Sequence, residues 1–435
     1  MRKISVLVVL LFIAILTPVA PASASTPKAG GVCAKLGASK VIAGKRFTCV
    51  RTGKKFVWYK GVSVKSKPIP AVSPVSTPEI FSAKIPIALP VVQNGDITFA
   101  NAASQYASIG KVAWQRVQDV ITANSAVDIP TTISIGPNTG TTKEQITRLL
   151  QREYRLFAGF SQPSTYLALV YNGKDEPWAE TEFTKIVAAR NYQIRATDFT
   201  ERVMRGACDL SNPADPVCAS GNALIFGNST DGATFHGVQE PYWTVSGENA
   251  GPMSQVDHEY THNVQFAQWI GSPPQGGVSN RAQLAHRVIP CWFQEGQANA
   301  IGITVWASDL RTYLDARRGN IARAINPNEP KPSLADFSAA SFTKFLGEQD
   351  PLQCYQPGTN GDYQLGYSVG YAAVEVLVAI GGPQATMALL SLTASGDTWE
   401  NAFRTVYGIS WQEGAGALGQ ALAAEYEVMP LGSNG

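Results

Sequence analysis

The sequence predicts an α+β protein with an α/β N-terminal lobe and a helical C-terminal lobe, preceded by a small disulfide-closed β module. Three observations predict this fold class. Two cysteines bracket a short basic segment near the start, helical and strand patterns alternate from about residue 100, and only helical patterns remain beyond about residue 290. With 435 residues, 45% of them hydrophobic, the chain is long enough for two or three folded units.

The first element is a predicted signal peptide over residues 1–24. Arg2 and Lys3 precede the apolar run 4–16, and residues 22–24 (Ala-Ser-Ala) form the small-residue pattern that signal peptidase cleaves. No later apolar run reaches the length of a membrane span. We therefore expect an exported protein, secreted or associated with the cell wall, without a transmembrane anchor.

Residues 25–62 form the predicted β module. Apolar and polar side chains alternate around "RFTCV" (46–50) and "KFVWY" (55–59), and "RTGK" between them is typical of a hairpin turn. Six cysteines in an exported chain favour disulfides, although six permit fifteen pairings. The three sequence-local pairs are the expected ones: Cys33–Cys49, Cys208–Cys218 and Cys291–Cys354.

Charge divides the chain into a basic front and an acidic body. Residues 1–92 hold 14 Lys+Arg and one acid, Glu79, whereas residues 93–435 hold 21 Lys+Arg and 32 Asp+Glu, a net charge of −11. The basic module is a candidate binder of anionic cell-wall polymers or lipid head groups, and a solvated basic face without a partner explains its charge equally well. We find no nucleotide-binding glycine loop and expect no nucleic-acid partner.

A linker and two lobes follow the module. Residues 63–92 carry six prolines among Ser and Val, which predicts an extended linker. Residues 93–290 form the predicted α+β lobe and residues 291–435 the helical lobe. The helices are predicted at 104–121, 142–160, 292–307, 309–325, 366–382, 383–394 and 398–408, and the strands at 131–136, 165–171 and 222–227.

The chain has four histidines, and two of them lie four apart in "HEYTH" (258–262). On a helix, His258 and His262 share one face and can chelate a single Zn²⁺, while Glu259 reaches a water on the metal rather than the metal itself. Two histidines do not complete a catalytic zinc site. Thirty-three residues after His262, Glu295 lies in the apolar helical segment "CWFQEGQANAIG", where burial would be costly without a cationic partner.

A helix over residues 254–269 is predicted to carry the two histidines. Ser254 is its expected cap, with Asp257 completing a capping box. Val256, Tyr260 and Val264 recur every four residues, so we expect them to form the buried stripe of this helix. The other two histidines, His236 and His286, are expected to be hydrogen-bonded loop residues rather than ligands.

The two motifs "HEYTH" and "WFQEGQA" resemble the gluzincin metallopeptidases, the group that contains thermolysin and aminopeptidase N. The resemblance implies an exported zinc metallopeptidase acting on a peptide or protein substrate, with Zn²⁺ held by His258, His262 and Glu295. It implies that Glu259 is the general base. It also implies that Asn299, four residues after Glu295, orients the first histidine in place of the family's aspartate.

The stretch "GYSVGYAAVEVL" is similar to the Y-x-x-G helix of the aminopeptidase N group, whose tyrosine stabilises the oxyanion. Tyr367 with Gly370 is the best-placed pair, and Tyr363 and Tyr371 are nearby alternatives. The amine-binding G-x-M-E-N strand of that group has no counterpart at the right distance, which leaves aminopeptidase specificity in doubt.

Two alternatives stay open from the sequence. Asp362 in "GTNGD" fits the third-ligand motif of the aspzincins, although it lies far from His262 and would leave "WFQEG" unexplained. Gln268 stands where the metzincins need a histidine, which excludes that group. The second alternative is a non-catalytic cell-wall or surface-binding protein that retains a zinc-peptidase scaffold.

Overall fold

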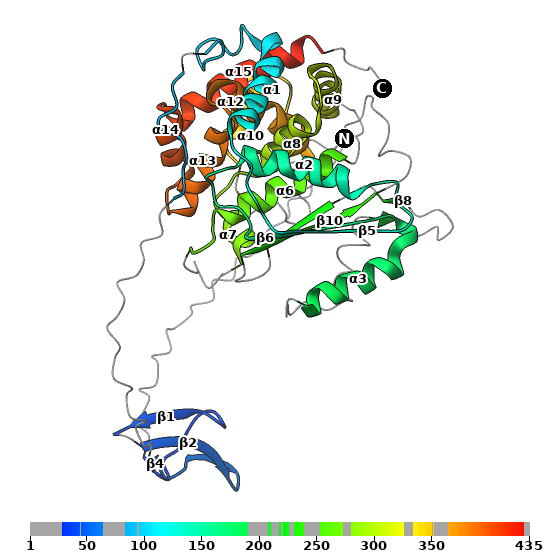
Figure 1. Cartoon of the computed structure of the whole chain (residues 1–435). Coiled ribbons are helices and arrows are strands. Elements are labelled where there is room, and N and C mark those ends of the chain that lie inside the picture. Colours follow the sequence, from blue (N-terminus) through cyan, green and yellow to red (C-terminus); the bar gives the residue numbers. More distant parts are fainter. Residues whose placement is uncertain are drawn as a thin grey trace, which may run out of the picture. The chain divides into compact units, whose positions relative to one another are not determined.

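The computed structural model divides into two compact units, Met1–Glu79 and Ile80–Gly435 (Figure 1). The predicted signal peptide, residues 1–24, lies outside the described residues. These are 28–63 except 44, 83–189 except 94, 208–209, 217–218, 221–225, 230–238, 253–272, 280–325, 334–349, 351 and 364–429.

The first unit is a small antiparallel sheet closed by a disulfide, as predicted. Its strands are β1 (Ser39–Ile42), β2 (Lys45–Thr52), β3 (Lys55–Trp58) and β4 (Val62–Ser63), and β2 pairs with each of the others. The turn between β2 and β3 contains Gly53 at φ +60°, a conformation that favours glycine. Cys33 and Cys49 are disulfide-bonded and pack with Trp58 as the core of this unit.

A four-stranded mixed sheet begins the second unit. The strand order is β5 (Thr131–Ile135), β6 (Thr165–Tyr171), β10 (Asp231–Gly237) and β9 (Gly221–Ile225). Strands β5 and β10 run parallel to β6, and β9 runs antiparallel to β10. The helices α2 (Lys143–Leu156) and α6 (Met253–Ala267) cover one face and α3 (Glu176–Ala189) the other (Figure 1). Strand β6, whose side chains are almost all buried, therefore lies inside the fold.

Beyond β10 every described element is a helix, as predicted for the C-terminal lobe. After α6 the helices are α7 (Arg281–Ala285), α8 (Cys291–Trp306), α9 (Leu310–Ala322), α10 (Ala339–Gly347), α12 (Tyr371–Gly381), α13 (Pro383–Ala394), α14 (Trp399–Tyr407) and α15 (Trp411–Glu427), with the short 3-10 or π segments η3 (Arg323–Ile325) and η5 (Gly366–Gly370). A further 3-10 segment, η1 (Gly173–Asp175), lies earlier in the chain, between β6 and α3. No single helix among the described residues is long and apolar enough to cross a membrane, although η5 with α12 and α13 pass that test together as one bent pair.

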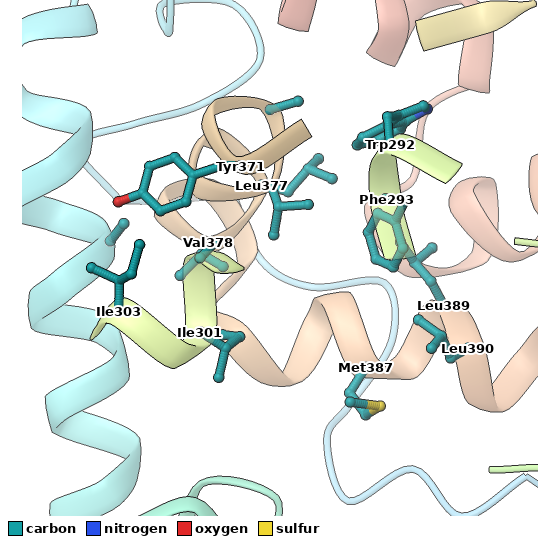
Figure 2. Packing of buried hydrophobic residues seen from close by; sticks show 14 of the residues in the cluster. Trp292, Phe293, Ile301, Ile303, Tyr371, Leu377, Val378, Met387, Leu389 and Leu390 are labelled. Atoms are coloured by element: carbon teal, nitrogen blue, oxygen red, sulfur yellow. The ribbon is translucent and has the colours of Figure 1, made fainter. Parts of the chain in front are cut away.

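Helix α8 runs through the hydrophobic core of the second unit. Its Trp292, Phe293, Ile301 and Ile303 are buried beside apolar side chains of α12 and α13, such as Tyr371, Leu377, Met387 and Leu389 (Figure 2). Helix α1 (Tyr106–Ala123), from the N-terminal part of the second unit, also packs against α12. Because α8 is enclosed on several sides, a polar residue on it has a fixed position and few ways to reach water.

The start of α6 differs from the sequence prediction. The helix begins at Met253, so Ser254 lies inside its first turn and does not cap it. Asp257 makes no capping box, because neither of its carboxylate oxygens has a hydrogen-bond partner. The predicted buried stripe is confirmed, since Val256, Tyr260 and Val264 are all fully buried.

The predicted linker 63–92 ends earlier than the prolines suggested. The second unit begins at Ile80, and Ile85, Ile87, Leu89 and Val91 pack against its core. The backbone N–H of Val91 donates to the carbonyl of Val406 (2.8 Å). Alternate apolar residues between the prolines therefore make this stretch part of the body.

The remaining cysteines are described only in part. Strands β7 (Cys208–Asp209) and β8 (Val217–Cys218) pair antiparallel with Cys208 directly opposite Cys218, although their side chains lie outside the described residues. Cys291 is disulfide-bonded. Its expected partner, Cys354, lies outside the described residues, so that pairing stays a prediction.

Candidate metal centre

Two closely packed helices bring the candidate ligands together. Helix α6 carries His258 and His262 one turn apart, and α8 carries Glu295. A Cβ atom on Gly302 of α8 would lie 2.7 Å from the backbone nitrogen of His258, so only glycine permits this approach. The spacing within "HEYTH" and the glycine in α8 together set the distance between the ligands.

The three ligand atoms form a small triangle. Nε2 of His258 lies 3.1 Å from Nε2 of His262, and Oε2 of Glu295 lies 3.6 Å and 3.3 Å from those two atoms. All three residues are buried, with exposed fractions of 8%, 6% and 3%. In the part of the chain that the structure describes, no other group of three His, Cys, Asp or Glu side chains converges in this way.

The triangle has the dimensions of a tetrahedral metal site. Nitrogen and oxygen donors bound at about 2.0–2.2 Å to a tetrahedral ion lie about 3.3–3.6 Å from one another. The observed edges of 3.1, 3.3 and 3.6 Å agree with that spacing. Three protein ligands also leave a fourth position for water or substrate. His258, His262 and Glu295 can therefore hold a metal ion.

The outer nitrogens of both imidazoles are held by side-chain amides. Nδ1 of His258 lies 3.0 Å from Oδ1 of Asn299, and Nδ1 of His262 lies 2.8 Å from Oε1 of Gln265. An amide oxygen accepts, so each Nδ1 carries a proton and each Nε2 faces the centre, where a bound metal ion would take its lone pair. Asn299 thus lies where the sequence placed it, whereas Gln265 was not expected.

Both amides are themselves fixed by hydrogen bonds. Nδ2 of Asn299 donates to the carbonyl of Tyr367 (2.9 Å). Nε2 of Gln265 donates to the carbonyl of Gln294 and to Oε1 of Gln297, both at 2.9 Å. Because an amide that donates through nitrogen must present oxygen on its other side, these bonds determine which atom faces each histidine.

The electrostatics of the group favour a positive charge at its centre. Burial alone would lower the pKa of His262, but the carboxylates of Glu295 and Glu259 reverse this and raise it to about 9. Burial alone would raise the pKa of Glu295, yet the two histidines hold it well below its usual range. The buried carboxylate of Glu295 is thus stabilised by positive charge beside it, and a metal ion would meet the same requirement.

Glu259, the predicted general base, lies on α6 between the two histidines and is 7% exposed. Burial raises the pKa of its carboxyl group, with a smaller contribution in the same direction from Glu295, while His258 and His262 oppose the shift. The three charged groups that shift the pKa of Glu259 are thus the three candidate ligands. The structure therefore brings Glu259 close to the centre.

Tyr367 is the candidate oxyanion donor that lies at the centre. Its ring stacks on that of His258, with centroids 5.8 Å apart and an interplanar angle of 20°. The guanidinium carbon of Arg323, in η3, lies 5.7 Å from the Tyr367 ring centroid. Tyr371 is instead buried in the core, where its hydroxyl donates to Tyr313 (3.2 Å). Tyr363 lies outside the described residues.

Tyr367 belongs to η5, a π-helical segment that packs backbone to backbone on α8. A Cβ on Gly370 would lie 2.1 Å from the carbonyl oxygen of Trp292, and one on Gly296 would lie 2.3 Å from the carbonyl carbon of Gly370. A Cβ on Gly366 would lie 3.0 Å from Cβ of Glu295. Single-turn π segments are frequent at functional sites, and here three glycines place one directly on the third-ligand helix.

A pair of buried acids on α2 and α6 was not predicted from the sequence. Glu153 of α2 and Asp257 of α6 are fully buried, and none of their four carboxylate oxygens has a hydrogen-bond partner. Burial raises the pKa of each carboxyl well above its usual range, the charge of Asp257 raises that of Glu153 further, and Arg152 opposes both shifts. Since a charged carboxylate is costly in such a place, both groups are favoured in the protonated form.

The remaining sequence candidates lie elsewhere. His236 is not a loop residue: it lies in β10, fully buried, with Nε2 2.7 Å from Oγ1 of Thr234. Burial, with a smaller contribution from His258, lowers its pKa to about 3. His286 follows α7, and its ring lies 5.7 Å from that of Phe266. Asp362, the aspzincin alternative, lies outside the described residues.

Comparison of the chain with protein-family models, with curated proteins and with solved structures finds no match.

Proposed function

We propose that the chain is an exported zinc metallopeptidase with a gluzincin-like catalytic domain. The observation that carries the proposal is the triangle of His258, His262 and Glu295, with Glu259 on the same helix turn as the two histidines. Two imidazoles and one carboxylate form a donor set of borderline softness, which suits zinc better than magnesium or calcium. The disulfide Cys33–Cys49 is compatible with export.

In this proposal the chain's own residues supply proton transfer and charge stabilisation. Zinc, when bound, would activate a water and polarise the scissile carbonyl. Glu259 accepts the proton of the attacking water and returns it to the leaving amine, and its raised pKa suits both roles. Tyr367, stacked beside His258, donates its phenolic proton in a hydrogen bond to the developing oxyanion. Asn299 and Gln265 keep both imidazoles in the ligating tautomer.

The test separates metal binding from turnover. Glu259→Gln is expected to keep zinc and to lose peptide hydrolysis by several orders of magnitude, because it removes the proton acceptor and no ligand. Glu295→Gln is the matched substitution on α8 and is expected to lose zinc as well. Zinc content is measured by elemental analysis, and hydrolysis by mass spectrometry of a peptide panel digested with and without a chelator.

Three outcomes would contradict the proposal. If the parent protein takes up no transition metal after zinc supplementation, the centre is not a zinc site. If Glu259→Gln cleaves as fast as the parent, the assigned proton acceptor is wrong. A protein that binds zinc but cleaves no peptide in the panel would favour the alternative, a non-catalytic surface-binding protein with a zinc-peptidase scaffold.

A further inference from the structure

The first unit exposes large apolar side chains to an extent that the other described residues do not. Of the eight large hydrophobic residues that are exposed in the described part of the chain, six lie in this small unit. They are Val32, Leu36, Val41, Phe56, Tyr59 and Val62. Where exposed apolar side chains gather in one patch, they commonly mark a surface for interaction.

Strand register gathers five valines on one face of the sheet. Val41 and Val62 lie opposite Arg46 from the two sides of β2, and Val57 lies opposite Val50. Residues opposite one another share a face, as do residues four apart on one strand, so Arg46 and Val50 face the same way. An isolated bridge places Val32 opposite Val57, which adds it to this face. We call Val32, Val41, Val50, Val57 and Val62 the valine face.

The opposite side of the sheet holds the unit's own core. Cys49 and Trp58 are opposite one another there, and Cys33 and Phe47 pack against them. Among the described residues of this unit, none covers the valine face in this way: Val32, Val41 and Val62 are 73%, 58% and 63% exposed. An antiparallel sheet that packs one face on its core and exposes the other to water ordinarily carries polar residues on the exposed face.

The described part of the same unit carries only positive charge. Residues 28–63 contain nine Lys and Arg and no Asp or Glu. All nine are exposed: Lys28, Lys35, Lys40, Lys45, Arg46, Arg51, Lys54, Lys55 and Lys60. Arg46 lies between Val41 and Val62, and Lys55, opposite Thr52, lies on the valine face as well. Long cationic side chains at the edge of an apolar patch can hold their charges at the level of a polar layer.

We propose that the valine face docks on the surface of an anionic lipid bilayer. A soluble polyanion would be bound by the lysines and arginines and would gain nothing from five valines. The boundary between head groups and acyl chains offers both partners, since apolar side chains enter it while cations meet the anionic head groups. The inference concerns the first unit alone and does not depend on the proposed peptidase activity.

The experiment uses the full mature chain and vesicle flotation. The parent is expected to float with vesicles of phosphatidylglycerol and phosphatidylcholine in equal amounts and to stay unbound with phosphatidylcholine alone. Val41→Ser with Val62→Ser is expected to weaken binding to the mixed vesicles about tenfold, because it removes apolar contact and leaves every charge in place. Arg46→Gln with Lys55→Gln is expected to weaken it about 30-fold at low salt, since each basic residue near an anionic surface contributes about 1 kcal/mol.

The matched control is Val92→Ser with Val428→Ser. These are the two other exposed valines among the described residues, 70% and 58% exposed. Both lie in the second unit, so their replacement is expected to leave binding unchanged. Retention of the Cys33–Cys49 disulfide and an unchanged thermal midpoint verify that each variant is folded.

Inorganic polyphosphate serves as the soluble polyanion in a parallel titration. If the parent binds polyphosphate but does not float with the mixed vesicles, the partner is an anionic polymer such as one of the cell wall. If the double valine variant floats as well as the parent, the valine face does not enter the lipid. A parent that binds neither probe would show a solvated basic face. Each of these results overturns the proposal.

Discussion

Gly296→Ala tests how tightly the candidate centre depends on the contact between α8 and η5. A Cβ at this position would lie 2.3 Å from the carbonyl carbon and 2.4 Å from the carbonyl oxygen of Gly370, whereas ordinary contacts begin at 3.4 Å. The obstacle is backbone, which cannot rotate out of the way as a side chain can. The two segments must therefore separate by about 1 Å.

This displacement has two expected consequences. Alanine in a helix interior is about 1 kcal/mol more favourable than glycine, but overpacking of this kind costs about 1–3 kcal/mol, so the free energy of unfolding is expected to fall by up to about 2 kcal/mol. Glu295 is the adjacent residue, and Tyr367 lies on the displaced segment. A 1 Å error in a triangle with edges of 3.1–3.6 Å is expected to weaken zinc binding about 10- to 100-fold.

Gly416→Ala is the matched control, because Gly416 lies inside α15 and no atom lies within 4 Å of its added Cβ. This variant is expected to gain stability and to bind zinc as the parent does. Thermal unfolding gives the stability of each variant, and competition with a chromophoric chelator gives the zinc affinity. If Gly296→Ala gains stability like the control and retains the parent's zinc affinity, the close approach of α8 and η5 does not position the centre.

Three further predictions concern the body. Glu153→Gln is expected to raise the free energy of unfolding by about 1–3 kcal/mol at neutral pH and by less at pH 4. Burial raises the pKa of this carboxyl in the native state, so the native state loses stability as the pH rises above the pKa that Glu153 has in the unfolded chain. His236 acts in the opposite direction: its pKa of about 3 makes the native state lose about 4 kcal/mol between pH 7 and pH 3, and His236→Asn is expected to flatten that part of a chemical-denaturation series. Deletion of residues 25–79 is expected to leave turnover and thermal midpoint unchanged, whereas deletion of 25–92 lowers the midpoint by removing four packed apolar residues. Equal midpoints for the two deletions would show that residues 80–92 do not stabilise the body.

Elements with strong local patterns were predicted from the sequence with the correct bounds. Strand β6 coincides with the predicted 165–171, and α13 with the predicted 383–394. The first is a continuous apolar run, and the second follows a glycine and starts at Pro383. Strand β10 was missed because "DGATFHG" alternates over only four residues, with Ala233 and Phe235 as its apolar members, and its glycines at 232 and 237 are unfavourable in strands. It lies between β6 and β9, so pairing on both sides, rather than propensity, makes it a strand.

For the candidate centre, the spacing of residues along the sequence predicted the three ligands but not all of the side chains that hydrogen-bond to them. His258, His262 and Glu295 were found because rare residues lay at helical spacing or in an apolar helix. Gln265 was missed because a glutamine three residues after a histidine is unremarkable until α8 packs beside it. The capping box of Ser254 with Asp257 was wrongly predicted for a related reason. Asp257 has the spacing of a capping acid, but the packing of α2 on α6 buries it near Glu153.

The two amides on the imidazole N–H groups determine how the centre responds to acidity. A carboxylate at the position of Asn299 or Gln265 would add negative charge to the group and would release its histidine once protonated. Amides have no titrating proton, so the orientation of both rings is the same in weak acid as in weak base. With a divalent ion, two neutral imidazoles and one carboxylate, the centre would carry one net positive charge, and the partner of each Nδ1 would add no negative charge to it. If the proposed activity falls on acidification, the cause would then be protonation of the ligands or of Glu259. The amides of Asn299 and Gln265, which orient the histidines, do not titrate.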